Sequence, residues 1–194
     1  VKVASATPRI RVADPVYNAQ VICEQAKEAA EHGAKIVVFP ELCITGYTCN
    51  DLFLQELLLE KAKEALLTIA EETGQLETLF LVGLPVDKDG RLYNVAAVLY
   101  RGRILGMIPK KNIPMYAEFY EGRHFTPGEE TVTEYRLGKQ VIPFGSNLLF
   151  RCEELPELIL GCELCEDLWV AEPPSTSHAL MGATVIANLS ASNE

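Results

Sequence analysis

Apolar residues recur along the chain in two patterns, stretches with helical spacing and short continuous runs typical of buried strands. A first helix is expected behind Asp14, whose side chain can cap the first turn, with Pro15 preset for that turn, and it runs to about His32. Gly33 then supplies a permissive stop, and a second amphipathic helix ends near Gly74. The apolar positions that share one face are Ala19, Ile22, Cys23, Ala26 and Ala30 in the first helix, and Leu58, Ala62, Ala65, Leu66 and Ile69 in the second.

The short apolar runs predict strands separated by loops and turns. The dipeptide Arg101-Gly102 predicts a hairpin, and a long polar loop follows over residues 109–130, a feature that is often functional. A short helix is expected at about 175–182, behind two prolines. Strands that alternate with helices, together with one hairpin, predict an α/β domain with a mixed sheet. The expected strands are residues 1–6, 36–39, 79–83, 93–100, 104–108, 148–152, 157–162 and 184–188.

Composition narrows the class of protein. A chain of 194 residues with 48% hydrophobic residues can bury one sizeable core, so a single domain is expected. The net charge of -10 argues against nucleic acid as a partner, because affinity for nucleic acid depends on clustered Lys and Arg. The sequence has no apolar stretch near the ~20 residues that span a bilayer, nor the pattern of a signal peptide. A cytoplasmic protein without a membrane segment is therefore expected.

The cysteines and the two ends of the chain complete this picture. A core of this size does not need disulfides, so the six cysteines are expected to be reduced thiols. The chain starts inside a strand-like run without an initiator Met and stops just after another strand. We therefore expect a fragment of a longer protein, incomplete at its C-terminal end.

Three segments place a charged or reactive residue at the exit of an apolar strand, where side chains reach a common sheet edge: VVFPELCITGY, MIPKKNIPMYAEFYEGRHF and ILGCELCEDLW. In the first, Glu41 follows a buried strand and Pro40, so its carboxylate is held at the rim. Partial burial would raise its pKa and make it a base. The alternative is that Glu41 caps a turn or pairs with a surface lysine.

Cys165 is the candidate nucleophile of the third segment. Acidic neighbours disfavour a free thiolate, and a thiol near its reference pKa of ~8.5 needs a base to take its proton, for which Glu41 is the candidate. Cys162 and Cys165 also form a Cys-x-x-Cys pair, but zinc needs two further ligands, and strand alternation places the two side chains on opposite faces. None of the three histidines, at positions 32, 124 and 178, lies in a reactive segment, which disfavours Cys-His chemistry.

Lys110 and Lys111 leave a strand together, and a pair of surface lysines is the simplest interpretation. The acidic and aromatic residues that follow favour another. A lysine held by a carboxylate such as Glu121 would be a fixed cation, suited to stabilising the oxyanion of a tetrahedral adduct.

The chain order Glu, Lys, Glu, Cys resembles the nitrilase superfamily. The resemblance implies Glu41 in FPELCITGY as base, Lys110 in KKNIPMY as oxyanion stabiliser, Glu121 as supporting acid and Cys165 in CEDLW as nucleophile. Within the superfamily the chain is most similar to the amidase domains of glutamine-dependent NAD synthetases. This similarity extends over nearly all of the chain and is carried by TPRIRVADPVYNA, ELCITGYTCNDLF, CEDLWVAEPPSTSHALMGA and ANLSASNE.

The resemblance implies a four-layer αββα sandwich over residues 1–194, with the catalytic residues at one strand end. Tyr116 and Ser192 would contact glutamine, and Glu166 would line the same pocket. Leu164 is a mild departure from the family pattern. The family's domain continues beyond Glu194 with further strands and a substrate-binding arginine.

The implied activity is hydrolysis of the glutamine side-chain amide through a cysteine thioester, without metal or organic cofactor in this domain. Ammonia would pass to the protein's own C-terminal synthetase domain, which would use ATP, Mg and deamido-NAD. The resemblance also implies a homo-oligomer. The chain itself has no Walker loop or other phosphate loop. The alternatives are a stand-alone amidase or carbamoylase and a catalytically inactive scaffolding domain.

Overall fold

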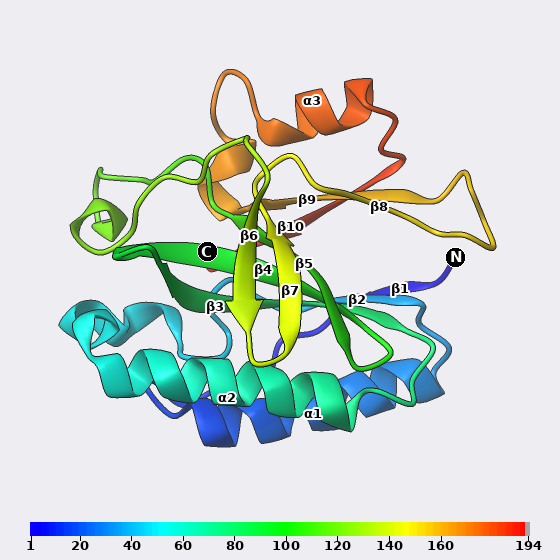
Figure 1. The fold of residues 1–194 in the computed structure, drawn as a ribbon, viewed down its shortest axis with the longest axis horizontal. Coiled ribbons are helices and arrows are strands. Elements are labelled where there is room, and N and C mark those ends of the chain that lie inside the picture. The colour runs from blue at the N-terminus through cyan, green and yellow to red at the C-terminus, as the bar shows by residue number, and fades with distance from the viewer. Residues whose placement is uncertain (193–194) are drawn as a thin grey trace.

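The computed structural model describes residues 1–192, and it contains two β-sheets that pack face to face between helices (Figure 1). The larger sheet has seven strands in the order β1-β2-β3-β4-β5-β7-β6. Strands β1, β2 and β3 are parallel to one another, whereas β3-β4, β4-β5 and β6-β7 are antiparallel pairs, so the sheet is mixed. The bounds are β1 Val3–Ser5, β2 Ile36–Val38, β3 Leu79–Lys88, β4 Arg91–Tyr100, β5 Arg103–Pro109, β6 Thr133–Leu137 and β7 Gln140–Phe144.

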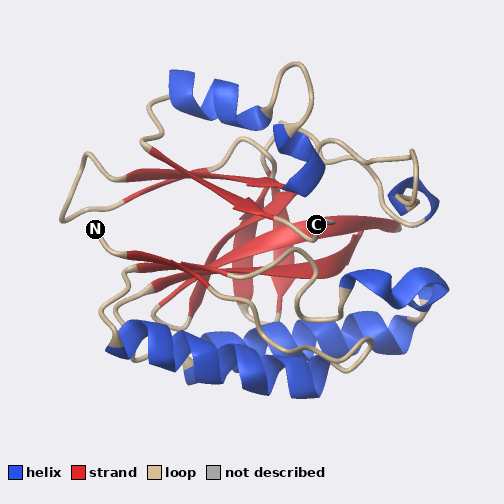
Figure 2. Ribbon diagram, turned by 180° about the vertical axis from the view of Figure 1, so that it is seen from behind, coloured by secondary structure: helices blue, strands red, loops and turns tan. Residues whose placement is uncertain are grey.

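The smaller sheet has the order β10-β9-β8 and lies against the other face of the larger one. Its strands are β8 Leu149–Arg151, β9 Ile159–Leu164 and β10 Val185–Leu189. Helices α1 (Pro15–Glu31) and α2 (Glu56–Glu72) cover the outside of the larger sheet, and α3 (Pro174–Leu180) covers the smaller one (Figure 2). The layers therefore run helix, sheet, sheet, helix, which is the predicted αββα sandwich.

Local sequence explains the ends of α1. Asp14 accepts a hydrogen bond from the backbone N-H of Tyr17 at 3.1 Å, and Pro15 occupies the first turn. Gly33 follows the helix with a φ of +80°, a conformation that costs glycine little. The predicted start and stop of this helix are confirmed.

Two apolar cores hold the layers together. One lies between α1, α2 and the larger sheet, and the other lies between the two sheets. Because each fully buried Leu, Ile or Val side chain contributes roughly 1.5 to 3 kcal/mol, these cores supply the main force that stacks the layers. The inter-sheet core includes Leu81, Val98 and Ile108 from the larger sheet and Leu160, Cys162 and Leu189 from the smaller.

Several predicted boundaries are wrong. Strand β3 continues to Lys88, and Asp89 and Gly90, both with positive φ, turn it directly into β4. Asp87 and Lys88 end the apolar run before the strand itself ends, although Asp89-Gly90 is a strong signal for a two-residue hairpin. The β6-β7 hairpin was not predicted at all, and β9 lies two residues later than expected.

The cysteines of this fold are all free thiols. Five of the six are buried, and only Cys152 is partly exposed. Among residues 1–192, no helix combines the length and the apolar character that crossing a membrane requires.

Candidate active site

The three segments singled out in the sequence meet at one edge of the sandwich. Glu41 follows β2, Lys110 follows β5 directly, and Cys165 follows β9 in the other sheet. β2 and β5 run in the same direction, because β3 and β5 are both antiparallel to β4, so their carboxyl ends share one edge. The topology thereby gathers residues that are far apart in the sequence.

The turn that carries Glu41 packs tightly against β3. Leu42 has a φ of +53°, and the backbone of the turn lies directly over Gly83. A Cβ at Gly83 would lie 2.3 Å from the backbone nitrogen of Leu42 and 2.7 Å from the carbonyl oxygen of Pro40. The backbone N-H of Ile44 also donates to the Gly83 carbonyl at 3.1 Å. Only glycine at position 83 allows this approach.

A buried ion cluster forms the centre of the site. Lys110 is 0% exposed, and its Nζ donates to Glu41 Oε1 at 2.7 Å and to the two oxygens of Glu121 at 2.7 and 2.9 Å. Two neutral donors complete it, since Asn94 Nδ2 donates to Glu41 Oε1 at 2.7 Å and the Tyr47 hydroxyl donates to Glu121 Oε1 at 2.9 Å. Charges this deeply buried persist only when they are paired and hydrogen-bonded, as they are here.

Neighbouring charges set the protonation of this cluster. Burial raises the pKa of Glu41, which is only 2% exposed; the Lys110 charge opposes this, and the Glu121 carboxylate adds to it. Burial acts to lower the pKa of Lys110, but the two carboxylates outweigh it and leave that pKa raised. Lys110 therefore stays charged, and Glu41 is a stronger base than an exposed carboxylate.

Cys165 begins the turn after β9 in a left-handed conformation, with a φ of +41°, and it is 6% exposed. Such a conformation is costly for a residue with a Cβ. Its Sγ lies 3.5 Å from Ser192 Oγ. Burial raises the pKa of Cys165, and so does the nearby Glu41 carboxylate, while Ser192, Lys110 and the Ala191 N-H lower it. The thiol is therefore protonated at rest and needs a base before it can attack.

Asp167 links the cysteine turn to the segment after Lys110. Its carboxylate accepts from the backbone N-H of Leu164 at 3.1 Å, and from the backbone and side-chain nitrogens of Asn112 at 2.7 and 2.9 Å. These contacts fix the position of Cys165 relative to Lys110.

Tyr116, Glu166 and Ser192, which the resemblance assigns to substrate, lie on the more open side of Cys165. The Tyr116 hydroxyl donates to Glu166 Oε2 at 2.8 Å, although Tyr116 is 54% exposed. The bond to the Glu166 carboxylate raises the pKa of Tyr116. Glu166 directly follows Cys165 in the turn after β9.

Cys162 lies within β9 and is buried in the core between the sheets, whereas Cys165 lies in the turn after the strand. Among the described residues, no group of three or more His, Cys, Asp or Glu side chains is placed to hold a metal ion. The histidines bond outside the cluster: His32 to the carbonyl of Glu28, His124 to Asp51 and His178 to the carbonyl of Ser146.

Sequence reasoning missed three members of this site: Asn94, Tyr47 and Asp167. Asn94 stands in the otherwise apolar run YNVAAVLY, and a polar residue inside such a strand was a usable signal. Tyr47 and Asp167 stand inside two of the segments singled out, but nothing in the sequence told them apart from their polar neighbours.

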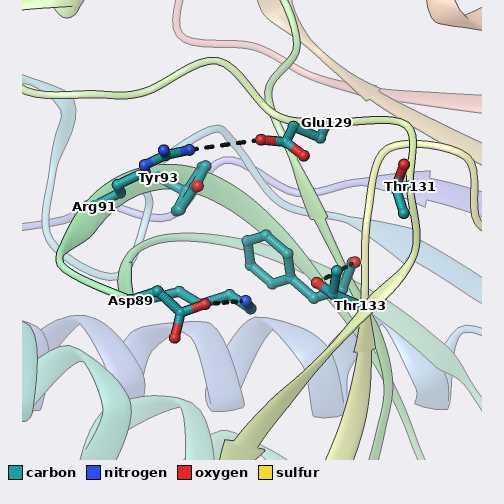
Figure 3. A pocket seen from close by; sticks show the side chains of 8 residues that line it. Asp89, Arg91, Tyr93, Glu129, Thr131 and Thr133 are labelled. Carbon is teal, nitrogen blue, oxygen red and sulfur yellow. Dashed lines mark hydrogen bonds and ion pairs between the residues drawn. The ribbon is translucent and has the colours of Figure 1, made fainter.

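A separate cleft of about 310 Å³ lies beside the β3-β4 turn and β6 (Figure 3). Its cations are paired with acids, Lys88 with Asp89 at 2.5 Å and Arg91 with Glu129 at 3.5 Å. No member of the ion cluster lines this cleft.

A sandwich of two sheets with a cysteine beside a carboxylate-lysine-carboxylate cluster defines the nitrilase type of hydrolase. The sequence profile of the carbon-nitrogen hydrolase family matches residues 2–194, and the chain belongs to that family.

Two relatives are glutamine-dependent NAD(+) synthetases. The chain is 42% identical to the one from Mycobacterium bovis over 192 residues, which is 99% of this chain but 28% of that protein. The crystal structure of another, from Cytophaga hutchinsonii, superposes with a TM-score of 0.87 at 30% identity, covering 99% of this chain and 30% of that one. The chain thus spans less than a third of the length of these relatives.

The fold also matches a smaller protein, an amidase from Nesterenkonia sp. AN1. The TM-score is 0.75 at 20% identity, with 97% of this chain and 64% of that one covered. In that structure the acetamide moiety of fluoroacetamide is covalently added at the active-site cysteine. At this identity the match supports the shared fold.

Proposed function

We propose that this chain hydrolyses the side-chain amide of glutamine through a thioester on Cys165, and that the ammonia is used to make NAD. The observation that carries the proposal is the buried cluster of Glu41, Lys110 and Glu121 beside a protonated thiol. The similarity to glutamine-dependent NAD(+) synthetases supports the choice of glutamine.

In the first half-reaction the Cys165 sulfur attacks the amide carbon while Glu41 takes the thiol proton. Lys110 has three N-H hydrogens, and it donates to Glu41 and to both oxygens of Glu121. One of the two bonds to Glu121 would give way to the oxyanion, which a backbone N-H would also stabilise. When the tetrahedral adduct collapses, the C-N bond breaks, and Glu41 returns its proton to the leaving ammonia.

The second half-reaction uses the same carboxylate. Glu41 deprotonates a water that attacks the thioester, the C-S bond breaks, and the proton returns to the Cys165 sulfur as glutamate leaves. The raised pKa of Glu41 suits this alternation between base and acid.

Substrate recognition is proposed for the open side of Cys165. The Glu166 carboxylate matches the ammonium group of glutamine, and its bond to Tyr116 holds it in place. Ser192, 3.5 Å from the sulfur, would contact the substrate beside the reacting carbon.

The use of the ammonia is a proposal about the full-length protein. A C-terminal synthetase domain would adenylate deamido-NAD with ATP and Mg, and ammonia from this domain would displace the adenylate. The glutaminase reaction itself uses no cofactor.

The test feeds amide-¹⁵N-glutamine, ATP, Mg and deamido-NAD to the full-length protein and follows the label into the carboxamide of NAD. Cys165→Ala is expected to abolish transfer from glutamine but to leave synthesis from added ammonia intact. Cys162→Ala is the matched control, since this thiol lies in the core, and most of the transfer is expected to remain.

Other outcomes favour other functions. Glutamine hydrolysis without labelled NAD would contradict the synthetase coupling, and hydrolysis of other small amides alone would favour a stand-alone amidase. No covalent addition of an electrophilic glutamine analogue to Cys165 would favour a scaffolding domain.

A further inference from the structure

The two oxygens of the Glu41 carboxylate have different surroundings. Oε1 accepts short bonds from Lys110 Nζ and Asn94 Nδ2, both at 2.7 Å. Among residues 1–192, Oε2 accepts one bond, a longer one of 3.2 Å from the backbone N-H of Ala191. A carboxylate oxygen has two lone-pair sites, so Oε1 is filled and Oε2 keeps one free.

The free site lies on the side of the thiol. Ala191 donates its N-H to Oε2, and the next residue, Ser192, places its hydroxyl 3.5 Å from the Cys165 sulfur. Oε2 is therefore the oxygen that faces Cys165.

We propose that Asn94 is a positioning residue: together with Lys110 it occupies Oε1 of Glu41, so that the Cys165 proton is transferred to Oε2. This inference rests on the proposed thiol chemistry and assigns the direction of its proton transfer.

The placement of Asn94 suits this role. It is fully buried on β4, and its backbone carbonyl accepts from the backbone N-H of Lys110 at 2.8 Å. One residue thus holds both the Glu41 carboxylate and the main chain of Lys110. Its Nδ2 also lies 3.5 Å from Glu121 Oε2.

An amide can do this without changing the charge of the cluster. Asn94 supplies a donor where a further cation would neutralise the base and a further carboxylate would repel it. Its Oδ1 is buried without a hydrogen-bond partner among the described residues. Burying an acceptor without a partner costs free energy of folding. That the fold keeps Oδ1 in this state indicates that the role of the side chain is the donation from Nδ2 to Glu41.

The charged and titratable groups around Glu41 come from four elements: Lys110 after β5, Glu121 at the start of the 3-10 helix Glu121–Arg123, Cys165 after β9, and Tyr47 at the start of the 3-10 turn Tyr47–Leu54. None of them changes when Asn94 is replaced. Loss of the Nδ2 donor destabilises the ionised form of Glu41, so its pKa rises further.

The test compares Asn94→Leu with wild type in the full-length protein. The acid limb of kcat/KM for glutamine is expected to move to higher pH by about one unit, as for the loss of one hydrogen bond to a charged group. We expect kcat to fall about ten-fold and KM to stay within about two-fold, because Asn94 does not contact substrate. The melting temperature is expected to stay close to that of wild type, since the unpaired oxygen is removed as well.

Asn94→Asp is the second variant, because it keeps the size and replaces the donor by an acceptor; its acid limb is expected to move further. Asn18→Leu is the matched control. Asn18 is also a fully buried asparagine, but it bonds to the main chain of Arg11 and Ile44 and to no carboxylate. It is expected to lower the melting temperature without moving the acid limb.

A second readout separates this inference from the proposed function. Alkylation of Cys165 by iodoacetamide requires the thiol proton to leave but does not require glutamine, and its acid limb is expected to move in the same way. An unmoved acid limb in both assays, a loss confined to KM, or failure of both Asn94 variants to fold would overturn the positioning role. Absence of glutamine hydrolysis in wild type, with the alkylation shift present, would overturn only the choice of substrate.

Discussion

Replacing Lys110 by Met should affect both catalysis and stability, because one ammonium group serves both. In the proposed mechanism the Lys110 ammonium group turns one N-H from Glu121 to the oxyanion. Losing one oxyanion donor costs about 2.7 to 4 kcal/mol, or roughly 10² to 10³ in kcat. The ammonium group also separates two buried carboxylates at 2.7 Å from each, and breaking a buried pair costs about 3 to 5 kcal/mol. Lys110 is completely buried, so solvent screening does not reduce this second effect.

The stability loss should depend on pH. Burial already raises the pKa of Glu41, and without the Lys110 charge it rises further. A group whose pKa is higher in the folded than in the unfolded state contributes stability at low pH and loses it as the pH rises through the folded pKa. Lys110→Met should therefore be more destabilised at pH 8 than at pH 5 relative to wild type.

The assays are glutamate release from glutamine and urea denaturation at the two pH values. Lys111→Met is the control, because Lys111 pairs with Glu130 near the surface at 2.5 Å. Its stability should stay within about 0.5 kcal/mol of wild type and its kcat should be unchanged. If Lys111 were the sensitive residue, or if Lys110→Met kept its activity, the proposed role of the cluster would be refuted.

Three further changes test the frame of the site. Gly83→Ala should destabilise the fold by at least about 2 kcal/mol and reduce activity, because its Cβ would meet the turn that carries Glu41. The control is Gly90→Ala, which adds a Cβ in open space at a residue with positive φ and should cost only about 1 kcal/mol. Equal losses of stability in the two variants would contradict the packing argument. Asp167→Ala should lower stability by about 1 to 3 kcal/mol and slow alkylation of Cys165, since the substitution leaves the N-H groups of Asn112 and Leu164 unpaired. A loss of stability with normal alkylation would show that Asp167 does not position the thiol. Since burial and Glu41 raise the pKa of Cys165, direct alkylation of this thiol should increase with pH through a midpoint above that of free cysteine, and a midpoint below it would contradict the electrostatics.

Features that depend on neighbouring residues could be predicted from the sequence. Asp14, Pro15 and Gly33 predicted the ends of α1 to within about one residue, and the Arg101-Gly102 turn was likewise predicted correctly. The order of strands and helices predicted an α/β domain with a mixed sheet. The four-layer sandwich came from the resemblance of the short motifs to the nitrilase superfamily, and both are confirmed. The β6-β7 hairpin was missed, since only four of its ten strand residues are buried and its apolar pattern is weak.

The sequence by itself thus determined the layers, the family and the candidate residues Glu41, Lys110 and Cys165. Only the tertiary structure decided which polar groups complete the site. Asn94 reaches Glu41 across 53 positions of the chain, and Tyr47 reaches Glu121 across 74. No local pattern encodes such distances. Burial raises the pKa of Glu41 and makes it a base. This burial arises only when the two sheets and their turns pack around the cluster, so the chemistry of this carboxylate depends on the tertiary structure.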